Sequence, residues 1–138
     1  MHPPRPLALL FAPLLALGVS ACASTASSSS FKGEQHAVAQ VISNFQSEAT
    51  AGEAQKICTS VLSTALTARL NAARGGCIEA LKSQLNEVDS PELTIQSVKL
   101  LGGANATAQL KSTHSGKSKV STMTLLKEGG KWKISGLA

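Results

Sequence analysis

The fold is decided by a stretch near the C-terminal end, residues 124–134, which reads TLLKEGGKWKI. Its Glu-Gly-Gly centre has the composition of a tight turn, and polar and apolar residues alternate after it. Trp132 and Ile134 therefore share one face of a strand, while the lysines before and between them share the other. A period of two is typical of a strand with one buried face. The stretch predicts an antiparallel hairpin with strands at residues 120–127 and 131–137.

Two further strands are predicted upstream of this hairpin. Leu93 and Ile95 alternate with polar residues, but Val98 and Leu100 continue the alternation one position out of step. A slip of one residue is what a β-bulge produces, so we expect a bend near Gln96-Ser97. The elements that follow are a turn at Gly102-Gly103, a strand at residues 104–112 and a polar loop at residues 114–119.

Helical periodicity marks the first half of the domain. A helix is predicted over residues 34–51, because apolar residues recur there every three to four positions. This stripe consists of Val38, Val41, Ile42, Phe45 and Ala49. Three shorter helices follow: one with Ile57, Val61 and Leu62, one with Leu66, Leu70 and Ala73 after an N-cap near Ser63-Thr64, and one with Ile78, Leu81, Leu85 and Val88 before Pro91.

Helices followed by strands predict an α+β domain, with the N-terminal helices packed on one face of a four-stranded antiparallel sheet. The length of 138 residues allows one domain of ordinary size, and a hydrophobic fraction of 43% excludes a wholly disordered chain. One Trp, three Phe and no Tyr leave little for stacking on bases or sugars. Nucleic-acid binding is therefore not expected.

The first residues predict export and membrane anchoring. Residues 7–19 carry no charge but are too few to span a bilayer, as expected for the apolar core of a secretory signal. Val19-Ser20-Ala21-Cys22 then resembles the lipobox of bacterial lipoproteins. The resemblance implies cleavage before Cys22, lipid on its sulfur and a location on the extracytoplasmic face of the cell membrane. An ordinary signal peptide is the alternative. The expected segments are a signal peptide at residues 1–21, a lipidated Ser-rich tether at residues 22–33 and a folded domain at residues 34–138.

If Cys22 carries lipid, the remaining cysteines, Cys58 and Cys77, form a pair. A disulfide is the expected state of such a pair in an exported protein. Closing a loop of this size would stabilise the fold by about 3 kcal/mol. A metal site would need two further ligands, and His36 and His114 lack ligand spacing, so neither a metal nor a cofactor is expected. A redox-active pair normally shows the closer Cys-x-x-Cys spacing.

The order of these motifs resembles the small NTF2-like (SnoaL-like) lipoproteins of actinobacteria. The resemblance is carried by a long first helix ending in Ala51-Gly52-Glu53, the STALTAR stretch at residues 63–69, the helix with Cys77 and, above all, residues 124–134. It implies a curved sheet wrapped around helices as a cone, often with a pocket at the wide end. The additional helix at residues 78–88 would fill part of that cone.

Within that cone, the candidate pocket residues are Phe45, Met123 and Trp132, each of which is equally suited to the hydrophobic core. NTF2-like enzymes place Asp, His or Tyr in the pocket for proton transfer. This chain has no Tyr, and its single Asp, Asp89, lies in a connection between a helix and a strand. His36 is on the polar face of the first helix and His114 lies in a polar loop. We therefore expect no catalytic residues.

Charge is distributed unevenly along the chain. From residue 93 onward there are seven lysines and a single acidic residue, whereas residues 32–92 carry a net negative charge. The excess predicts either lysines that protect strand edges and solvate the outer sheet face, or a basic surface. Such a surface would face anionic lipid headgroups, wall polymers or an acidic partner. The candidate surface residues are Lys111, Lys117, Lys119, Lys131 and Lys133.

Together these features predict a membrane-anchored envelope lipoprotein whose domain binds a small apolar ligand or an envelope protein without catalysis. Two alternatives remain open at this stage. One is an interaction adaptor without a pocket, belonging to an envelope transport or secretion complex. The other is a pocket enzyme of the isomerase or dehydratase type.

Overall fold

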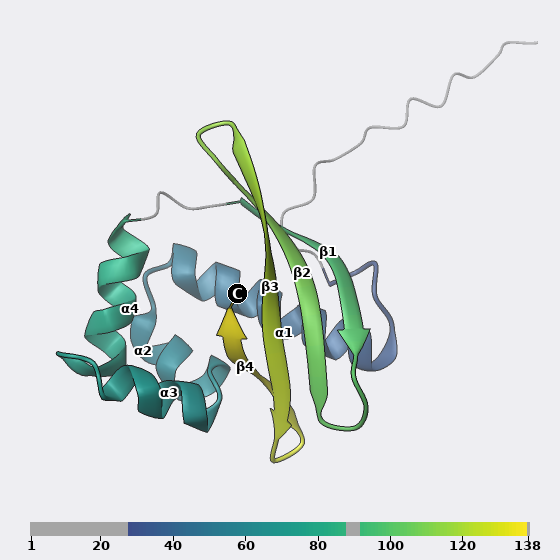
Figure 1. The fold of residues 1–138 in the computed structure, drawn as a ribbon, viewed down its shortest axis with the longest axis horizontal. Coiled ribbons are helices and arrows are strands. Elements are labelled where there is room, and N and C mark those ends of the chain that lie inside the picture. Colours follow the sequence, from purple (N-terminus) through teal and green to yellow (C-terminus); the bar gives the residue numbers. More distant parts are fainter. Residues whose placement is uncertain (1–27, 88–91, 138) are drawn as a thin grey trace, which may run out of the picture.

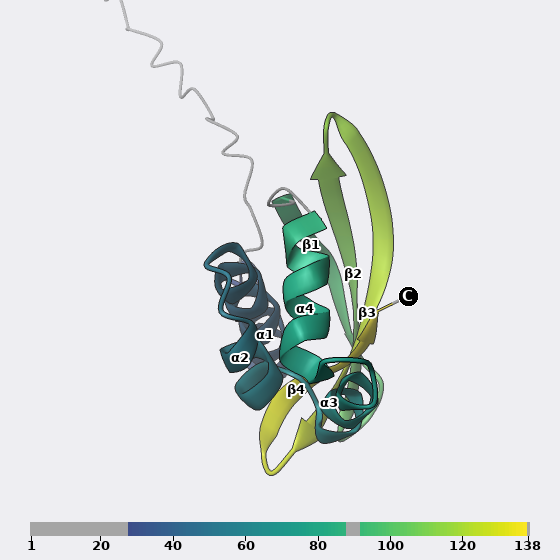
Figure 2. The ribbon, with the colours of Figure 1, turned by 90° about the vertical axis from the view of Figure 1, so that its left-hand side faces the viewer.

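The computed structural model describes residues 28–87 and 92–137 (Figure 1). Within these ranges the helices precede four antiparallel strands, as the sequence predicts. Helices α1, α2 and α4 lie on one side of the sheet (Figure 2). None of the described helices combines the length and the hydropathy needed to cross a bilayer. The predicted signal peptide, Cys22, Val88 and Asp89 lie outside the described residues.

Helix α1, Gly33–Thr50, confirms the long helix that the apolar stripe predicts. Val38, Ala39 and Ile42 are fully buried, whereas the polar face of the helix is exposed. The helix stops because Gly52 follows with a φ of +73°, a conformation that glycine adopts without steric cost.

The second helical stretch is divided where the sequence predicts. Helix α2, Ala54–Lys56, continues directly into a π-helical segment, η1, Ile57–Val61, which buries Ile57, Cys58 and Val61. Helix α3, Thr64–Asn71, begins after Ser63, whose hydroxyl accepts a hydrogen bond from the Leu66 amide at 3.1 Å. The predicted N-cap is therefore confirmed. Helix α4, Gly76–Glu87, follows with Cys77 and Leu81 facing the core.

The sheet is a meander in the order β1-β2-β3-β4. Its strands are β1 Glu92–Leu100, β2 Asn105–His114, β3 Lys117–Glu128 and β4 Lys131–Leu137. The register shifts between Ile95 and Ser97, so the predicted bulge is confirmed. Because of this shift, Ile95 and Val98 both point into the core although they are an odd number of residues apart.

The polar loop predicted at residues 114–119 is wrong. Strands β2 and β3 pair up to His114 and Lys117, leaving only Ser115 and Gly116 as the turn. Both turn residues have positive φ angles, +49° and +75°, which match the right-handed twist of a two-residue hairpin. The sequence pattern failed here because both faces of this ribbon carry exposed polar side chains, so no alternation marks the strands.

The sheet curls around the first helix. Glu34 contacts Trp132 of β4, while the adjacent Gln35 donates a hydrogen bond to the Val98 carbonyl of β1 at 3.0 Å. Two consecutive helical residues thus reach the two edge strands. The predicted curved α+β architecture is confirmed, with α1 rather than α4 occupying the concave side.

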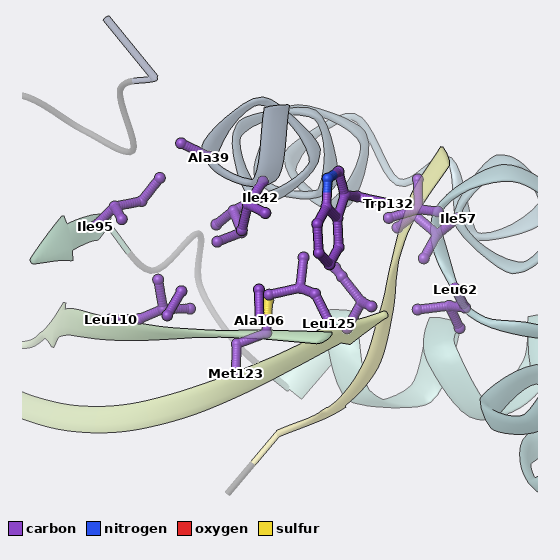
Figure 3. Packing of buried hydrophobic residues seen from close by; sticks show 14 of the residues in the cluster. Ala39, Ile42, Ile57, Leu62, Ile95, Ala106, Leu110, Met123, Leu125 and Trp132 are labelled. Atoms are coloured by element: carbon purple, nitrogen blue, oxygen red, sulfur yellow. The ribbon is translucent and has the colours of Figure 1, made fainter. Parts of the chain in front are cut away.

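The core lies between α1 and the concave face of the sheet (Figure 3). Every strand and every helical segment except α3 contributes buried residues to it. Each fully buried Leu or Ile supplies about 1.5–3 kcal/mol of transfer free energy. The largest side chains below 2% exposure are Ile42, Ile57, Leu110, Leu125 and Val38. The buried hydrophobic residues of the described ranges lie between Val38 and Ile134.

One edge of the sheet is covered by the chain segment that follows η1. Leu62 forms a parallel bridge with Ile134, and the Ser63 amide donates to the Ile134 carbonyl at 2.8 Å. Lys133 donates to the carbonyl of Ser60. The bridge and the Ser63 bond use backbone groups of β4 that would otherwise be open to pairing with another strand.

Candidate functional site

A cavity of about 230 Å³ opens at the end of the cone where α1 begins. We call it the mouth pocket. It is bounded by the first turn of α1, the turn between β1 and β2, and the ends of β3 and β4. Its lining residues are Glu34, Leu100, Gly102, Gly103, Asn105, Lys127 and Trp132.

The carboxylate of Glu34 is the centre of the mouth pocket. Its Oε2 accepts a hydrogen bond of 2.6 Å from the indole Nε1 of Trp132, and its Oε1 accepts one of 3.0 Å from the Lys127 ammonium. These bonds, with the indole contributing most and the lysine charge adding to it, hold the pKa of Glu34 below its ordinary value of 4.5. The carboxylate is therefore ionised at neutral pH, and its side chain remains 51% exposed.

Sheet register explains why Lys127 and Trp132 meet. They are directly paired across β3 and β4, next to the buried pair Leu125 and Ile134. The ammonium lies 5.6 Å from the centroid of the indole ring, within range of a cation–π interaction. Trp132 is 94% buried, so it fixes the position of both charged groups without exposing much of its own surface.

The rim of the pocket is apolar and exposed. Leu100 is 42% exposed and Leu101 55% exposed, at the end of β1 where the chain turns through Gly102. The Lys127 amide donates to the Ala104 carbonyl at 2.8 Å, which holds the turn against β3. The pocket therefore combines an ionised carboxylate with a small hydrophobic rim.

The three candidate pocket residues occupy different places. Trp132 lines the mouth pocket. Met123 is 98% buried in the core, where Figure 3 shows it beside Leu125 and Ala106. Phe45 is partly buried and packs against the same core from α1. The structure thus brings only Trp132 to a cavity, and Glu34, Lys127 and Asn105 join it there.

Sequence reasoning missed Glu34 and Lys127 as site residues. Lys127 lies two residues after Leu125 in the same strand, so the two side chains are on the same face of the sheet. The strand pattern could therefore have placed Lys127 on the concave face, across the turn from Trp132. Glu34 is 98 residues from Trp132 in the chain, and nothing in the local pattern joins the two.

His36 and His114, which the sequence analysis expects to be non-catalytic, do not line the mouth pocket. The Nδ1 of His36 lies 2.8 Å from the Ser28 carbonyl, on the exposed face of α1. His114 is exposed at the end of β2. Glu34, with a lowered pKa, is a poor proton carrier at neutral pH, since efficient acid–base groups have pKa values near the working pH.

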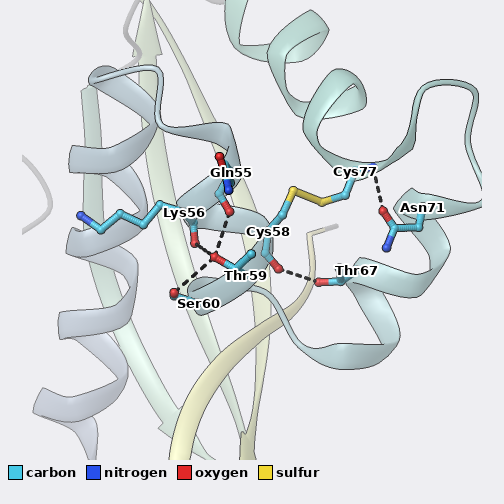
Figure 4. Close-up of a disulfide and its surroundings, with 8 residues drawn as sticks. All are labelled: Gln55, Lys56, Cys58, Thr59, Ser60, Thr67, Asn71 and Cys77. Carbon is cyan, nitrogen blue, oxygen red and sulfur yellow. Dashed lines mark hydrogen bonds between the residues drawn. A yellow bond between two sulfur atoms is a disulfide. The ribbon is translucent and has the colours of Figure 1, made fainter.

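The disulfide between Cys58 and Cys77 is confirmed (Figure 4). It joins η1 to the first turn of α4, and both cysteines are more than nine-tenths buried. The Thr67 hydroxyl donates to the Cys58 carbonyl at 3.1 Å, and Asn71 accepts from the Cys77 amide at 3.0 Å. Among the described residues no three His, Cys, Asp or Glu side chains gather as metal ligands would.

A wider, open groove of about 540 Å³ lies between α2, η1 and α4. Its charged groups are paired with one another: Lys56 lies 3.3 Å from Glu53 and 3.4 Å from Glu48, and Lys82 lies 3.3 Å from Glu79. The carboxylates, Glu53 first, raise the pKa of Lys56. We therefore regard the mouth pocket as the better candidate site.

The candidate basic surface is divided between the two ends of the sheet. Lys111, Lys117 and Lys119 lie around the β2–β3 turn, and Lys131 and Lys133 lie near the β3–β4 turn. In the second group, Lys133 donates a hydrogen bond to the Ser60 carbonyl. Only the first three form a continuous group.

No protein-family profile and no curated protein sequence matches the chain. Among solved structures, the chain is similar to an NTF2-like protein of unknown function from Silicibacter pomeroyi. The TM-score is 0.54 at 15% sequence identity, over 78% of this chain and 96% of the other. The chain thus has the NTF2-like fold, as the resemblance of residues 124–134 implies, and this likeness extends to the fold alone.

Proposed function

We propose that the protein is a membrane-anchored envelope lipoprotein whose domain binds without catalysis, and that the mouth pocket is its binding site. The observation that carries the binding role is the ionised Glu34 carboxylate, held by Trp132 and Lys127 beside exposed Leu100. A charged acceptor and an apolar rim together suit a group with an apolar body and a hydrogen-bond donor at its end.

The size of the pocket argues for a small guest. Pockets that enclose whole drug-sized ligands are about 300–1,000 Å³. At about 230 Å³ the mouth pocket suits one side chain of an envelope protein, or an equally small molecule. Exposed Leu100 and Leu101 would extend the contact beyond the pocket, which favours a protein partner.

Two features support a role without catalysis. Both oxygens of Glu34 already accept hydrogen bonds, and its pKa is lowered rather than raised toward neutrality. Of the described histidines, neither lines the pocket. A pocket enzyme would require a titratable group in contact with the reacting atoms.

Site-specific photocrosslinking in intact cells tests the binding site. A benzophenone amino acid replaces Leu100 in one chain and Val120 in the control, since both are exposed large hydrophobic residues at opposite ends of the sheet. We expect a discrete adduct from position 100 that is lost when Glu34→Gln is added. Adducts from position 120 only, or an adduct that is indifferent to Glu34→Gln, would contradict the proposal.

A small-molecule guest would appear in a second measurement. Native mass spectrometry of the protein purified from its own envelope would show an added mass that disappears in Glu34→Gln. Because Trp132 is the single tryptophan of the chain, its fluorescence reports directly on pocket occupancy.

Anchoring through Cys22 rests on Val19-Ser20-Ala21-Cys22 and is tested separately. Cells grown with radioactive palmitate should label the protein, and Cys22→Ala should abolish the label. Label that survives this substitution would contradict the lipid anchor but leave the mouth pocket untouched.

A further inference from the structure

The turn between β2 and β3 forms an exposed basic surface. We call residues 111–120 the hairpin tip. It projects as a narrow ribbon beyond the helices (Figures 1 and 2). Strand β4 pairs with β3 only from Met123 onward, so the β3 side of the tip has no β4 residue beside it.

All titratable side chains of the hairpin tip are basic. Lys111, Lys117 and Lys119 are exposed and form no ion pair with any described residue. Residues 93–127 contain no acidic residue, and Glu92, which is paired with Thr113 across β1 and β2, is the acidic residue beside the tip. His114 is the fourth titratable side chain of the hairpin tip and is also exposed.

Strand register distributes the charge around the ribbon. Lys111 is paired with Val120 on one face, whereas Lys119 is paired with Ser112 on the other. Lys117, paired with His114, lies on the same face as Lys119. The tip is therefore basic on both faces, and its positive potential points outward along the ribbon rather than toward one side.

We propose that the hairpin tip contacts the anionic phospholipid headgroups of the membrane surface. Attraction of lysines to an anionic surface needs no shape complementarity and falls off within a screening length of about 8–10 Å. A protein interface would need different chemistry. Its strongest contacts come from Trp, Tyr and Arg, and lysine is depleted there. The tip has lysines, hydroxyl residues and no aromatic or arginine.

The length of the tether keeps the domain close to the membrane, in a step that rests on the proposed lipid on Cys22. Ser28 is already bound to α1, through His36 at 2.8 Å and through Gln40 at 3.0 Å. Six residue steps separate Cys22 from Ser28, which span at most about 20 Å. A domain of this size has a diameter larger than that, so an anchored domain stays within one diameter of the headgroups.

Vesicle binding tests the proposal without the lipid anchor. The chain of residues 23–138 contains every residue of the described core, and is mixed with vesicles of phosphatidylglycerol and phosphatidylcholine in equal parts, or of phosphatidylcholine alone. We expect binding to the anionic vesicles only, and loss of binding in about 1 M salt, where the screening length is about 3 Å.

Matched variants locate the contact. Lys117→Gln with Lys119→Gln removes two charges from the tip, and Lys99→Gln with Lys131→Gln removes two exposed charges from the other end of the sheet. Each lysine near an anionic surface should strengthen binding about fivefold, so the tip variant should bind the vesicles about 25-fold more weakly than the wild type. The control variant should lose less than fivefold, and both should melt like the wild type.

Three results would overturn the proposal. Equal losses in the two variants would mean that net charge alone drives binding. Binding that persists in high salt would mean a contact that is not electrostatic. Absence of binding to anionic vesicles, together with a crosslink from position 117 to an envelope protein, would assign the tip to an acidic partner. None of these bears on palmitate labelling of Cys22, so the anchor and the tip fail independently.

Discussion

The two ends of the sheet carry lysines in similar number, but those lysines do different things. At the end of the sheet with the mouth pocket, Lys127 is bound to Glu34 and lies over Trp132, and Lys133 is bound to Ser60. Lys99 and Lys131 are exposed at this end. At the hairpin tip, lysines have no described ionic partner. The comparison teaches that a basic stretch of sequence becomes a basic surface only where the fold does not use its charges internally.

The largest expected difference between the two ends is in stability. Trp132→Ala removes a 94% buried ring and leaves the Glu34 carboxylate with one donor fewer, so it should lower the free energy of unfolding by about 3–5 kcal/mol. Val120→Ala at the tip should change it by less than about 0.5 kcal/mol. Urea denaturation followed by circular dichroism measures both, and comparable losses would contradict the distinction.

The disulfide should support the mouth end and not the tip. Replacing Cys58 and Cys77 with serine opens a 19-residue separation and should cost about 3 kcal/mol. The loss should increase amide hydrogen exchange in η1, α3 and α4, and in β4 through the Ser63 amide. Exchange at residues 114–120 should stay as it is. A uniform increase across the sheet would show that the two ends are not separate in stability.

A pH dependence should distinguish the mouth pocket as well. The pKa of Glu34 is lowered in the folded state, so its contribution to stability is present above the unfolded value near 4.5 and is lost as pH falls through the folded value. Glu34→Gln should therefore lower the melting temperature at neutral pH. The difference from wild type should disappear in strong acid. A difference that is constant with pH would exclude the carboxylate charge as its cause.

The smallest expected effect compares lysines of the two ends directly. Lys127→Ala removes an ion pair and a cation–π contact, and should destabilise the domain by about 1 kcal/mol. Lys119→Ala should have no measurable effect on the free energy of unfolding, since the side chain is exposed and unpaired among the described residues. Equal effects in denaturation experiments would remove the distinction on which the tip proposal rests.

Much of the fold was predictable because local patterns carried it. The bulge between Ile95 and Ser97 was predicted because the alternation of apolar and polar residues shifts by one position there. The Ser63 cap was predicted because this hydroxyl residue precedes apolar residues at helical spacing. The curled sheet was implied by the resemblance of residues 124–134. The failure at residues 114–119 has a physical cause: a ribbon that is exposed on both faces has no buried side to impose an alternation.

The candidate site was less predictable than the fold. Trp132 was identified, but its partner Glu34 is 98 residues away and is brought to it only by the curvature of the sheet around α1. The capping of α3 by Glu128, whose oxygens accept from the Thr64 amide and hydroxyl at 2.8 and 2.6 Å, is equally long-range. These bonds lower the pKa of Glu128. Contacts of this kind follow from tertiary packing and leave no local signal.

The position of β4 has a consequence for the order of folding. This strand is the last in the described chain, yet it supplies Trp132 and Ile134 to the core and fills the space between β3 and Ser63. A growing polypeptide that has not released its final residues cannot complete either the core or the bonds of Glu34. The domain can therefore bury its core fully only when residues 131–137 are in place.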